Sequence, residues 1–162
     1  YYEQSNEKTR ALFGQSLKES VDFAASYGVM LAFETMETEF LNTVSKAMYW
    51  VKKIDSPYLS VYPDSGNITN AALLYGTDVK EDVRSGQGHI AAVHLKESLQ
   101  GVYREVPYGS GHVDFASIVN TAYSMGVRRY LAEFWYLGQQ DYERDIKEAC
   151  TFLRSFFTDQ TV

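Results

Sequence analysis

The sequence has little of several features, and each scarcity narrows what the chain can be. One cysteine, Cys150, among 162 residues excludes an internal disulfide and a cysteine-rich metal site. No apolar run approaches the roughly 20 residues of a membrane-spanning helix. Residues 1–4 show no basic segment leading into an apolar stretch, as an export signal would. We therefore expect a cytoplasmic protein with no membrane partner.

Basic residues are also scarce relative to acidic ones. Lysine and arginine number 15 against 21 aspartates and glutamates, which gives a formal net charge of −6. A nucleic-acid-binding surface needs the opposite balance, because phosphate neutralisation by basic side chains contributes much of its affinity. We therefore expect no nucleic-acid partner and favour a small solute.

Hydrophobic residues make up 45 % of the chain and aromatic residues 15 %, enough for residues 1–162 to bury a core as a single domain. Short apolar runs, typical of buried strands, alternate along the chain with segments of helical spacing. The predicted strands are 29–33, 58–62, 90–95 and 130–134, and the predicted helices are 6–27, 41–54, a stretch after 67 ending near 84–88, 114–125 and 141–157. The order is α-βα-βα-βα-βα.

This order predicts a parallel sheet with right-handed crossovers, as in a doubly wound open sheet or a (β/α)₈ barrel. The open dinucleotide-binding version carries a glycine fingerprint after its first strand, whereas this chain has Glu34-Thr35-Met36-Glu37 there. The barrel is therefore favoured. A complete barrel needs roughly 250 residues and eight strands. The four parallel strands predict half of a (β/α)₈ TIM barrel, namely its second half.

Each predicted strand ends at or near an acidic or imidazole side chain, in the order Glu34, Asp64, His94 and Glu133. The carboxyl ends of parallel strands meet at one rim, where barrel enzymes carry out their chemistry. Any one of these residues alone is better explained as a helix cap or an ion pair. Four together predict a site for one divalent metal ion. Three oxygens and one nitrogen suit Mn²⁺ or Zn²⁺, with Co²⁺ or Mg²⁺ as alternatives.

Other polar residues carry weaker signals. Lys96 lies on the same face as His94, so it either neutralises a phosphate or an enolate or forms an ordinary surface ion pair with Glu97. The irregular stretch 98–112 is long enough for a functional loop, and its segment 109–111 (GSG) weakly suggests an anion site. We expect its histidine, His112, to be solvated.

Five segments resemble one enzyme family. They read LAFE at 31–34, YPDSGN at 62–67, GHIAAVHLK at 88–96, VPYGSGHVDF at 106–115 and LAEFW at 131–135. In this order they resemble the sugar-phosphate 3-epimerases of the xylose-isomerase-like TIM barrel superfamily. The similarity is to the L-xylulose 5-phosphate and L-ribulose 5-phosphate 3-epimerases, some of which are labelled hexulose-6-phosphate isomerase. The resemblance covers nearly the whole chain.

The resemblance implies an isomerase that inverts C3 of a ketopentose 5-phosphate by two-base proton transfer through a metal-stabilised enediolate. It places the metal on Glu34, Asp64, His94 and Glu133, with Glu34 and Glu133 as the two bases. It makes Asn67 and Lys96 substrate-binding residues. It also implies that four strand-helix units precede this C-terminal portion in family members and are absent here.

Two residues depart from the family pattern. The glycine loop of the family usually reads Gly-Glu-Gly where this chain has Ser110, and aspartate is usual where Glu97 stands. Both departures affect loop detail and substrate choice more than metal binding.

Three rival functions remain at this stage. The first is a hexulose-6-phosphate isomerase or a related aldose–ketose isomerase, which shares the metal and the fold. The second is a metal-dependent abasic-site endonuclease, which the three histidines and the acidic charge disfavour. The third is an inactive metal-binding half-barrel whose exposed sheet edges self-associate. Whether the chain is part of an enzyme or such an inactive half-barrel, we expect a homodimer.

Overall fold

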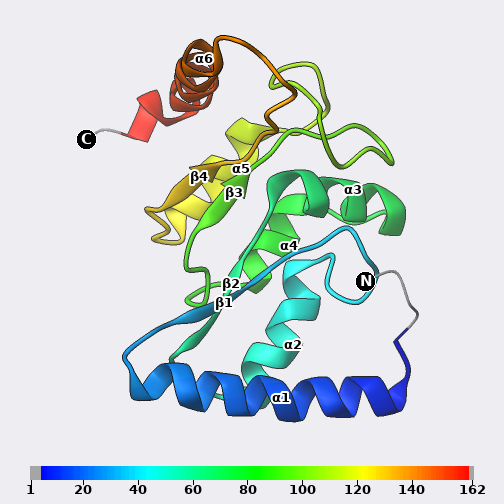
Figure 1. The fold of residues 1–162 in the computed structure, drawn as a ribbon. Helices are drawn as coiled ribbons and strands as arrows, with labels where there is room; N and C mark the ends of the chain where they lie inside the picture. The colour runs from blue at the N-terminus through cyan, green and yellow to red at the C-terminus, as the bar shows by residue number, and fades with distance from the viewer. Residues whose placement is uncertain (1–4, 161–162) are drawn as a thin grey trace.

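A computed structural model describes residues 5–160, so the first four residues, which we examined for an export signal, lie outside the described part. The elements are α1 (Glu7–Ser26), β1 (Leu31–Glu34), α2 (Val44–Ile54), β2 (Leu59–Tyr62), α3 (Ser65–Tyr75), α4 (Val79–Ser85), β3 (Val93–Leu95), α5 (Phe115–Ser124), β4 (Tyr130–Ala132), α6 (Tyr142–Arg154) and a 3₁₀ helix (Ser155–Gln160). The predicted alternation of helices and strands is confirmed (Figure 1).

One predicted helical stretch, the one that follows the second strand, is in fact two helices. Gly76 ends α3 in the left-handed conformation at φ 65°, which glycine adopts without steric cost. Asp78 then begins α4 by accepting a hydrogen bond from the backbone N–H of Lys80. A glycine stop followed two residues later by an aspartate cap is the local reason for the break.

The four strands run parallel and lie in sequence order. Residue Leu31 of β1 pairs with Leu59 of β2, and Val93 of β3 pairs with Tyr130 of β4. Isolated parallel bridges join the two pairs, one of them between Asp64 and His94. The order β1-β2-β3-β4 agrees with half of an α/β barrel, as the sequence predicted.

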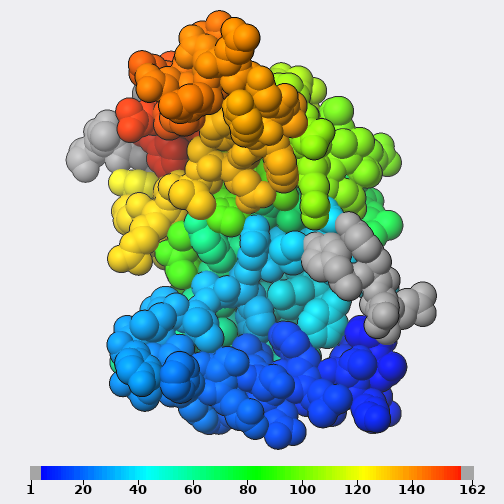
Figure 2. Space-filling model, viewed as in Figure 1, coloured from blue at the N-terminus to red at the C-terminus, as the bar shows by residue number. Residues whose placement is uncertain are grey.

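The core lies between the strands and the helices that cover them. Its most buried members, each at most 2 % exposed, come from helices α1 to α5 and from the two inner strands: Val21, Val44, Ala47, Val51, Leu59, Val61, Ile68, Val83, Val93, Leu95, Phe115, Ile118, Val119 and Ala122. Helices α1 and α6 lie at opposite ends of the molecule, with the other elements between them (Figures 1 and 2). Within the described residues, no helix combines the length and apolar character needed to cross a membrane.

The outer edges of the strand array are open. Within residues 5–160, β1 and β4 each pair with one strand and leave the other edge free. Met30, next to β1, is 53 % exposed, and Leu131 in β4 is 51 % exposed. Such edges present unpaired backbone groups and apolar side chains to solvent.

Candidate metal centre

The structure brings the four strand-end residues together. Glu34 is the last residue of β1, Asp64 lies two residues after the end of β2, His94 lies in β3, and Glu133 directly follows β4. One ligand atom from each lies within 4.8 Å of the others. Parallel pairing causes this meeting, because in-register parallel strands end at the same rim and the Asp64–His94 bridge aligns the two central strands.

Asp64 is held in place from both sides. Its Oδ1 accepts the Asn67 backbone N–H at 2.7 Å and so caps α3. Its own N–H donates to Oγ1 of the buried Thr35 at 2.8 Å. Burial raises the pKa of the Asp64 carboxyl, and the neighbouring Lys96 opposes that rise. One oxygen of Asp64 is therefore used by the helix, and the other, Oδ2, faces the cluster.

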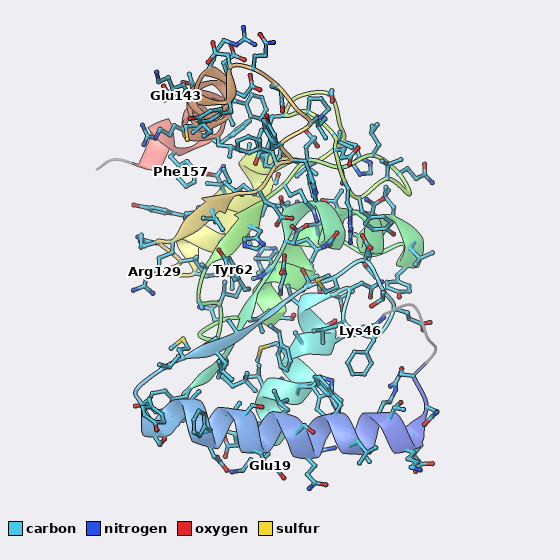
Figure 3. All side chains as sticks on the ribbon, in the orientation of Figure 1. Glu19, Lys46, Tyr62, Arg129, Glu143 and Phe157 are labelled. Atoms are coloured by element: carbon cyan, nitrogen blue, oxygen red, sulfur yellow. The ribbon has the colours of Figure 1, made fainter. Side chains whose placement is uncertain are left out.

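His94 lies between two carboxylates. Its Nδ1 is 2.9 Å from Glu34 Oε1 and 2.9 Å from Glu133 Oε2. Burial lowers the pKa of His94, but the hydrogen bonds to Glu133 and Glu34 outweigh it and raise the pKa to about 9. The ring also packs on Tyr62, labelled near the middle of Figure 3, with 4.0 Å between the centroids. One Nδ1–H cannot point fully at both carboxylates.

The residues fit a divalent cation. Asp64 Oδ2 and Glu133 Oε2 are buried, and their close partners, Lys96 Nζ at 3.1 Å and His94 Nδ1 at 2.9 Å, are poorly aligned for hydrogen bonding. Buried carboxylate oxygens that lack well-aligned hydrogen bonds are costly, so such groups are normally ion-paired or bind a metal. A cation held by these three carboxylates and the imidazole would satisfy them together. Three oxygens and one nitrogen form a hard donor set rather than one for copper(I).

Lys96 points into the same cluster. Its side chain is 5 % exposed, and its Nζ lies 3.1 Å from Asp64 Oδ2 and 3.9 Å from Glu133 Oε1. Nζ also donates to Asn67 Oδ1 at 3.1 Å. Of the two interpretations left open by the sequence, the surface ion pair with Glu97 is wrong. The ammonium lies beside the candidate ligands.

Asn67 has no polar atom left free. Its Nδ2 donates to the Thr35 carbonyl at 2.8 Å, and its Oδ1 accepts from Lys96. The residue is 2 % exposed. Its geometry therefore orients Lys96 and joins the β1–α2 loop to α3.

Glu97, which the sequence suggested only as a surface partner of Lys96 and as a departure from the family pattern, organises the glycine loop. Its carboxylate is buried and accepts the backbone N–H of Ser98 at 3.1 Å, Gly109 at 3.0 Å and Val113 at 3.1 Å. The anion suggested for segment 109–111 is thus the protein's own carboxylate. No signal in the sequence distinguished Glu97 from a surface residue beside Lys96.

His112 is also placed differently from the expectation. It is half-buried rather than solvated, and its Nε2 lies 3.1 Å from Ser98 Oγ. The backbone N–H of His112 donates to the Ser98 carbonyl at 3.0 Å. The two ends of the 98–112 loop therefore contact each other, and this closure partly shields the imidazole from solvent.

These features define a class of protein: part of an α/β barrel with a candidate metal centre at the carboxyl ends of its strands. The family model of the xylose isomerase-like TIM barrel matches residues 1–156, and the chain belongs to this family. The resemblance recognised in the sequence is confirmed at this level.

Curated relatives agree with the family assignment. Over 156 residues the chain is 35 % identical to the L-ribulose-5-phosphate 3-epimerase UlaE of Shigella flexneri, covering 96 % of this chain and 54 % of the relative. Over 136 residues it is 40 % identical to the protein of the same name from Salmonella paratyphi A, covering 83 % and 46 %. The chain spans about half the length of the curated relatives it matches.

Solved structures share the fold at low identity. The 3-keto-D-glucoside 4-epimerase YcjR from E. coli matches with a TM-score of 0.75 at 15 % identity, covering 96 % of this chain and 57 % of that one. An L-ribulose 3-epimerase matches with a TM-score of 0.72 at 17 % identity, covering 97 % and 55 %. These matches support the barrel architecture.

Proposed function

We propose that this chain is part of an isomerase that inverts C3 of a ketopentose 5-phosphate, either L-ribulose 5-phosphate or L-xylulose 5-phosphate. The observation that carries the proposal is the placement of Glu34 and Glu133 on either side of His94, each 2.9 Å from the same Nδ1. The 35–40 % identity to proteins named L-ribulose-5-phosphate 3-epimerase supports the choice of substrate class.

Epimerisation requires a base on each face of the reacting carbon. One base removes the C3 proton, and the other returns a proton to the opposite face of the planar enediolate. Glu34 and Glu133 come from β1 and β4, the first and last of the four strands, and converge on the centre from opposite sides. Their placement matches that requirement.

Accessibility divides the four residues into two pairs. The side chains of Glu34 and Glu133 are 39 % and 27 % exposed, whereas those of His94 and Asp64 are 12 % and 0 % exposed. A base must reach the substrate, while a residue that only binds metal need not. We therefore assign proton transfer to the glutamates and metal holding mainly to Asp64 and His94.

One divalent cation, Mn²⁺ or Zn²⁺ in our assignment, would act as a Lewis acid that makes the C3 proton more acidic when bound by these four residues. In this proposal Lys96 binds the substrate through its ammonium, which lies beside the candidate metal ligands Asp64 and Glu133. Asn67 contributes to substrate binding by orienting Lys96.

The decisive experiment follows deuterium in the full-length protein supplied with Mn²⁺ or Zn²⁺ in D₂O. The proposal expects label at C3 of the ketose phosphate and inversion there. Label at C1 would instead identify an aldose–ketose isomerase of the hexulose-6-phosphate type. Absence of any exchange under conditions where the metal binds would contradict both activities.

A second candidate has its own observation. Met30 and Leu131 are about half exposed beside the free edges of β1 and β4. A half-barrel that binds metal, covers these edges by self-association and lacks epimerase activity fits this exposure. Exchange at C3 by this chain alone would exclude it.

A further inference from the structure

The loop between β3 and α5 is tied at both ends to one buried carboxylate. Glu97 accepts a hydrogen bond from Ser98 at the start of the loop and from Gly109 and Val113 near its end. Hydrogen bonds to a charged acceptor are about twice as strong as neutral ones. Glu97 therefore fixes where residues 107–113 lie.

The loop leaves no room for a side chain where it crosses this carboxylate. A Cβ added to Gly111 would lie 2.2 Å from the Ser98 carbonyl oxygen and 2.3 Å from Glu97 Oε1. Neither atom can move away easily, because one is backbone and the other is held by N–H groups. The loop and the Glu97 carboxylate thus fit each other closely.

The same loop carries Tyr108 to the end of β4. The Tyr108 hydroxyl has one proton to donate and lies closer to the Leu95 carbonyl, which also accepts the Glu133 N–H, than to the Glu133 carbonyl at 3.1 Å. Its ring packs against Phe152, with 5.7 Å between the centroids, and against Phe115 at 5.8 Å. Tyr108 therefore joins the carboxyl ends of β3 and β4 to the interior of the loop.

The backbone position of Glu133 depends on the contact with the Tyr108 hydroxyl, because β4 is the outer strand of the array. Its backbone N–H donates to the Leu95 carbonyl at 3.0 Å, and its carbonyl faces the Tyr108 hydroxyl. Its carboxylate reaches to 2.9 Å from His94 Nδ1. A small rotation of the Glu133 backbone would move the carboxylate out of the cluster.

We propose that Glu97 is a positioning residue, which fixes the Glu133 backbone through Gly109 and Tyr108 and so sets the Glu133 carboxylate in the candidate metal centre. The part of this inference that concerns metal and proton transfer rests on the proposed function. The mechanical part, from Glu97 to Glu133, does not depend on it.

The experiment therefore begins with a readout that needs no metal. Amide hydrogen exchange is measured over residues 130–136 in Glu97→Gln, Tyr108→Phe and the control Glu105→Gln, an exposed carboxylate of the same loop. Loss of a hydrogen bond in the path is expected to speed exchange at the Glu133 amide about two- to tenfold. Glu105→Gln should leave that exchange unchanged.

Metal affinity provides the second readout, with Co²⁺ as the probe. Loss of a residue that orients a ligand typically weakens metal binding about 10- to 100-fold. We expect weaker Co²⁺ binding and an altered Co²⁺ absorption spectrum in Glu97→Gln and Tyr108→Phe. In Glu97→Asp, which keeps the carboxylate, we expect the affinity and the spectrum to recover. The double variant Glu97→Gln, Tyr108→Phe should bind Co²⁺ no more weakly than the single variant with the lower affinity, because both substitutions act on one path.

The outcomes separate the two proposals. Unchanged exchange at Glu133 in folded Tyr108→Phe and Glu97→Gln would overturn the positioning role and leave Glu97 as a loop anchor. If Glu97→Gln does not fold, Tyr108→Phe alone decides, because removing one hydroxyl leaves the ring packing intact. Faster exchange at Glu133 in a protein without C3 epimerisation would retain the positioning role and reject the proposed reaction.

Discussion

Lys96 Nζ lies 3.1 Å from Asp64 Oδ2 in the protein interior, where the two side chains are only 5 % and 0 % exposed. The pair gives the cluster its charge balance. Three carboxylates, from Glu34, Asp64 and Glu133, face one ammonium, which leaves two negative charges when His94 is neutral. A divalent cation would neutralise them, so the net charge of the cluster suits such an ion as well as its donor atoms do.

Lys96→Met is expected to destabilise the metal-free chain. Breaking a buried ion pair leaves the partner charge uncompensated, which costs about 3–5 kcal/mol, and we expect about 2–4 kcal/mol because Asp64 can take up a proton instead. Chemical denaturation with a chelator present measures this. Lys80→Met, which removes an exposed partner of Asp78, is the control and should change little. Equal effects of the two substitutions would contradict the buried pair.

Metal binding is expected to stabilise the chain through Asp64. At a free metal concentration 100 times the Kd, linkage gives about 2.7 kcal/mol. This corresponds to an increase in Tm of roughly 5–10 °C for a chain of this size. Asp64→Asn keeps an efficient helix cap but removes a charged ligand, so the variant should fold and lose most of the increase.

Asp114→Asn is the matched control for that substitution. Asp114 caps α5 as Asp64 caps α3, accepting the Ser117 backbone N–H at 2.9 Å, but it lies outside the cluster. Differential scanning calorimetry with and without Mn²⁺ should show the full stabilisation in Asp114→Asn. Loss of the stabilisation by Mn²⁺ in both Asp64→Asn and Asp114→Asn would indicate a general effect on helix caps rather than a metal site.

Metal affinity is expected to rise with pH. In the metal-free chain the pKa of His94 is raised from 6.5 to about 9, so at pH 7 its imidazole is protonated and must lose a proton to bind a metal. Apparent affinity for Mn²⁺ should increase close to tenfold per pH unit between about pH 7.5 and 8.5, with about one proton released per ion from His94. Nearer pH 7 the Asp64 carboxyl, whose pKa burial raises to about 7, releases a further fraction of a proton. Calorimetric titration in two buffers of different ionisation enthalpy measures the release.

The raised pKa of His94 also determines the direction in which the stability of the metal-free chain changes with pH. A raised pKa means that the folded state binds the proton more tightly than the unfolded state. The stabilisation is complete below pH 6.5 and is lost as the pH rises through about 9. A metal affinity and a metal-free Tm that are both independent of pH across this window would contradict the arrangement around His94.

The two-base assignment predicts an asymmetry between Glu34→Gln and Glu133→Gln in the full-length protein. Both variants should lose inversion, by about 10²–10⁴-fold. Each variant retains one base, so it should still exchange the C3 proton of one of the two epimers with solvent. The C3 proton of the other epimer should not exchange. The epimer that exchanges in Glu34→Gln should be the one that does not exchange in Glu133→Gln. Nuclear magnetic resonance of each epimer in D₂O measures this. Glu39→Gln, an exposed glutamate, serves as control.

The chain studied alone is expected to self-associate through its open edges. Replacing Met30 and Leu131 with lysine places charge beside the free edges of β1 and β4 and should shift the chain towards monomer. Light scattering across a concentration series measures the mass. Leu12→Lys, at a position on α1 rather than on an edge strand and 54 % exposed, should not change the mass. A stable, soluble monomer of the unaltered chain would refute the expectation.

The sequence was sufficient for the order of elements and for the residues at the strand ends. Apolar runs, helical spacing and caps are local, so each can be recognised within a window of about ten to eighteen residues. Parallel strands then bring residues at equivalent positions to one rim, which is why Glu34, Asp64, His94 and Glu133 could be grouped without coordinates. The break between α3 and α4 was missed although its signals, Gly76 and Asp78, are also local.

Only the tertiary structure decided which partners the buried charged side chains have, because the sequence allows more than one partner for each of them. Lys96 and Glu97 are adjacent, and the sequence allowed them to pair with each other. In the fold, Lys96 instead contacts Asp64, and Glu97 binds the N–H groups of Gly109 and Val113. Successive residues of an extended segment, such as the one that continues β3, point to opposite sides, and the loop that contacts Glu97 returns from more than ten residues away. A buried charge takes whichever partner the packing of distant segments brings to it, and that choice is not encoded in local spacing.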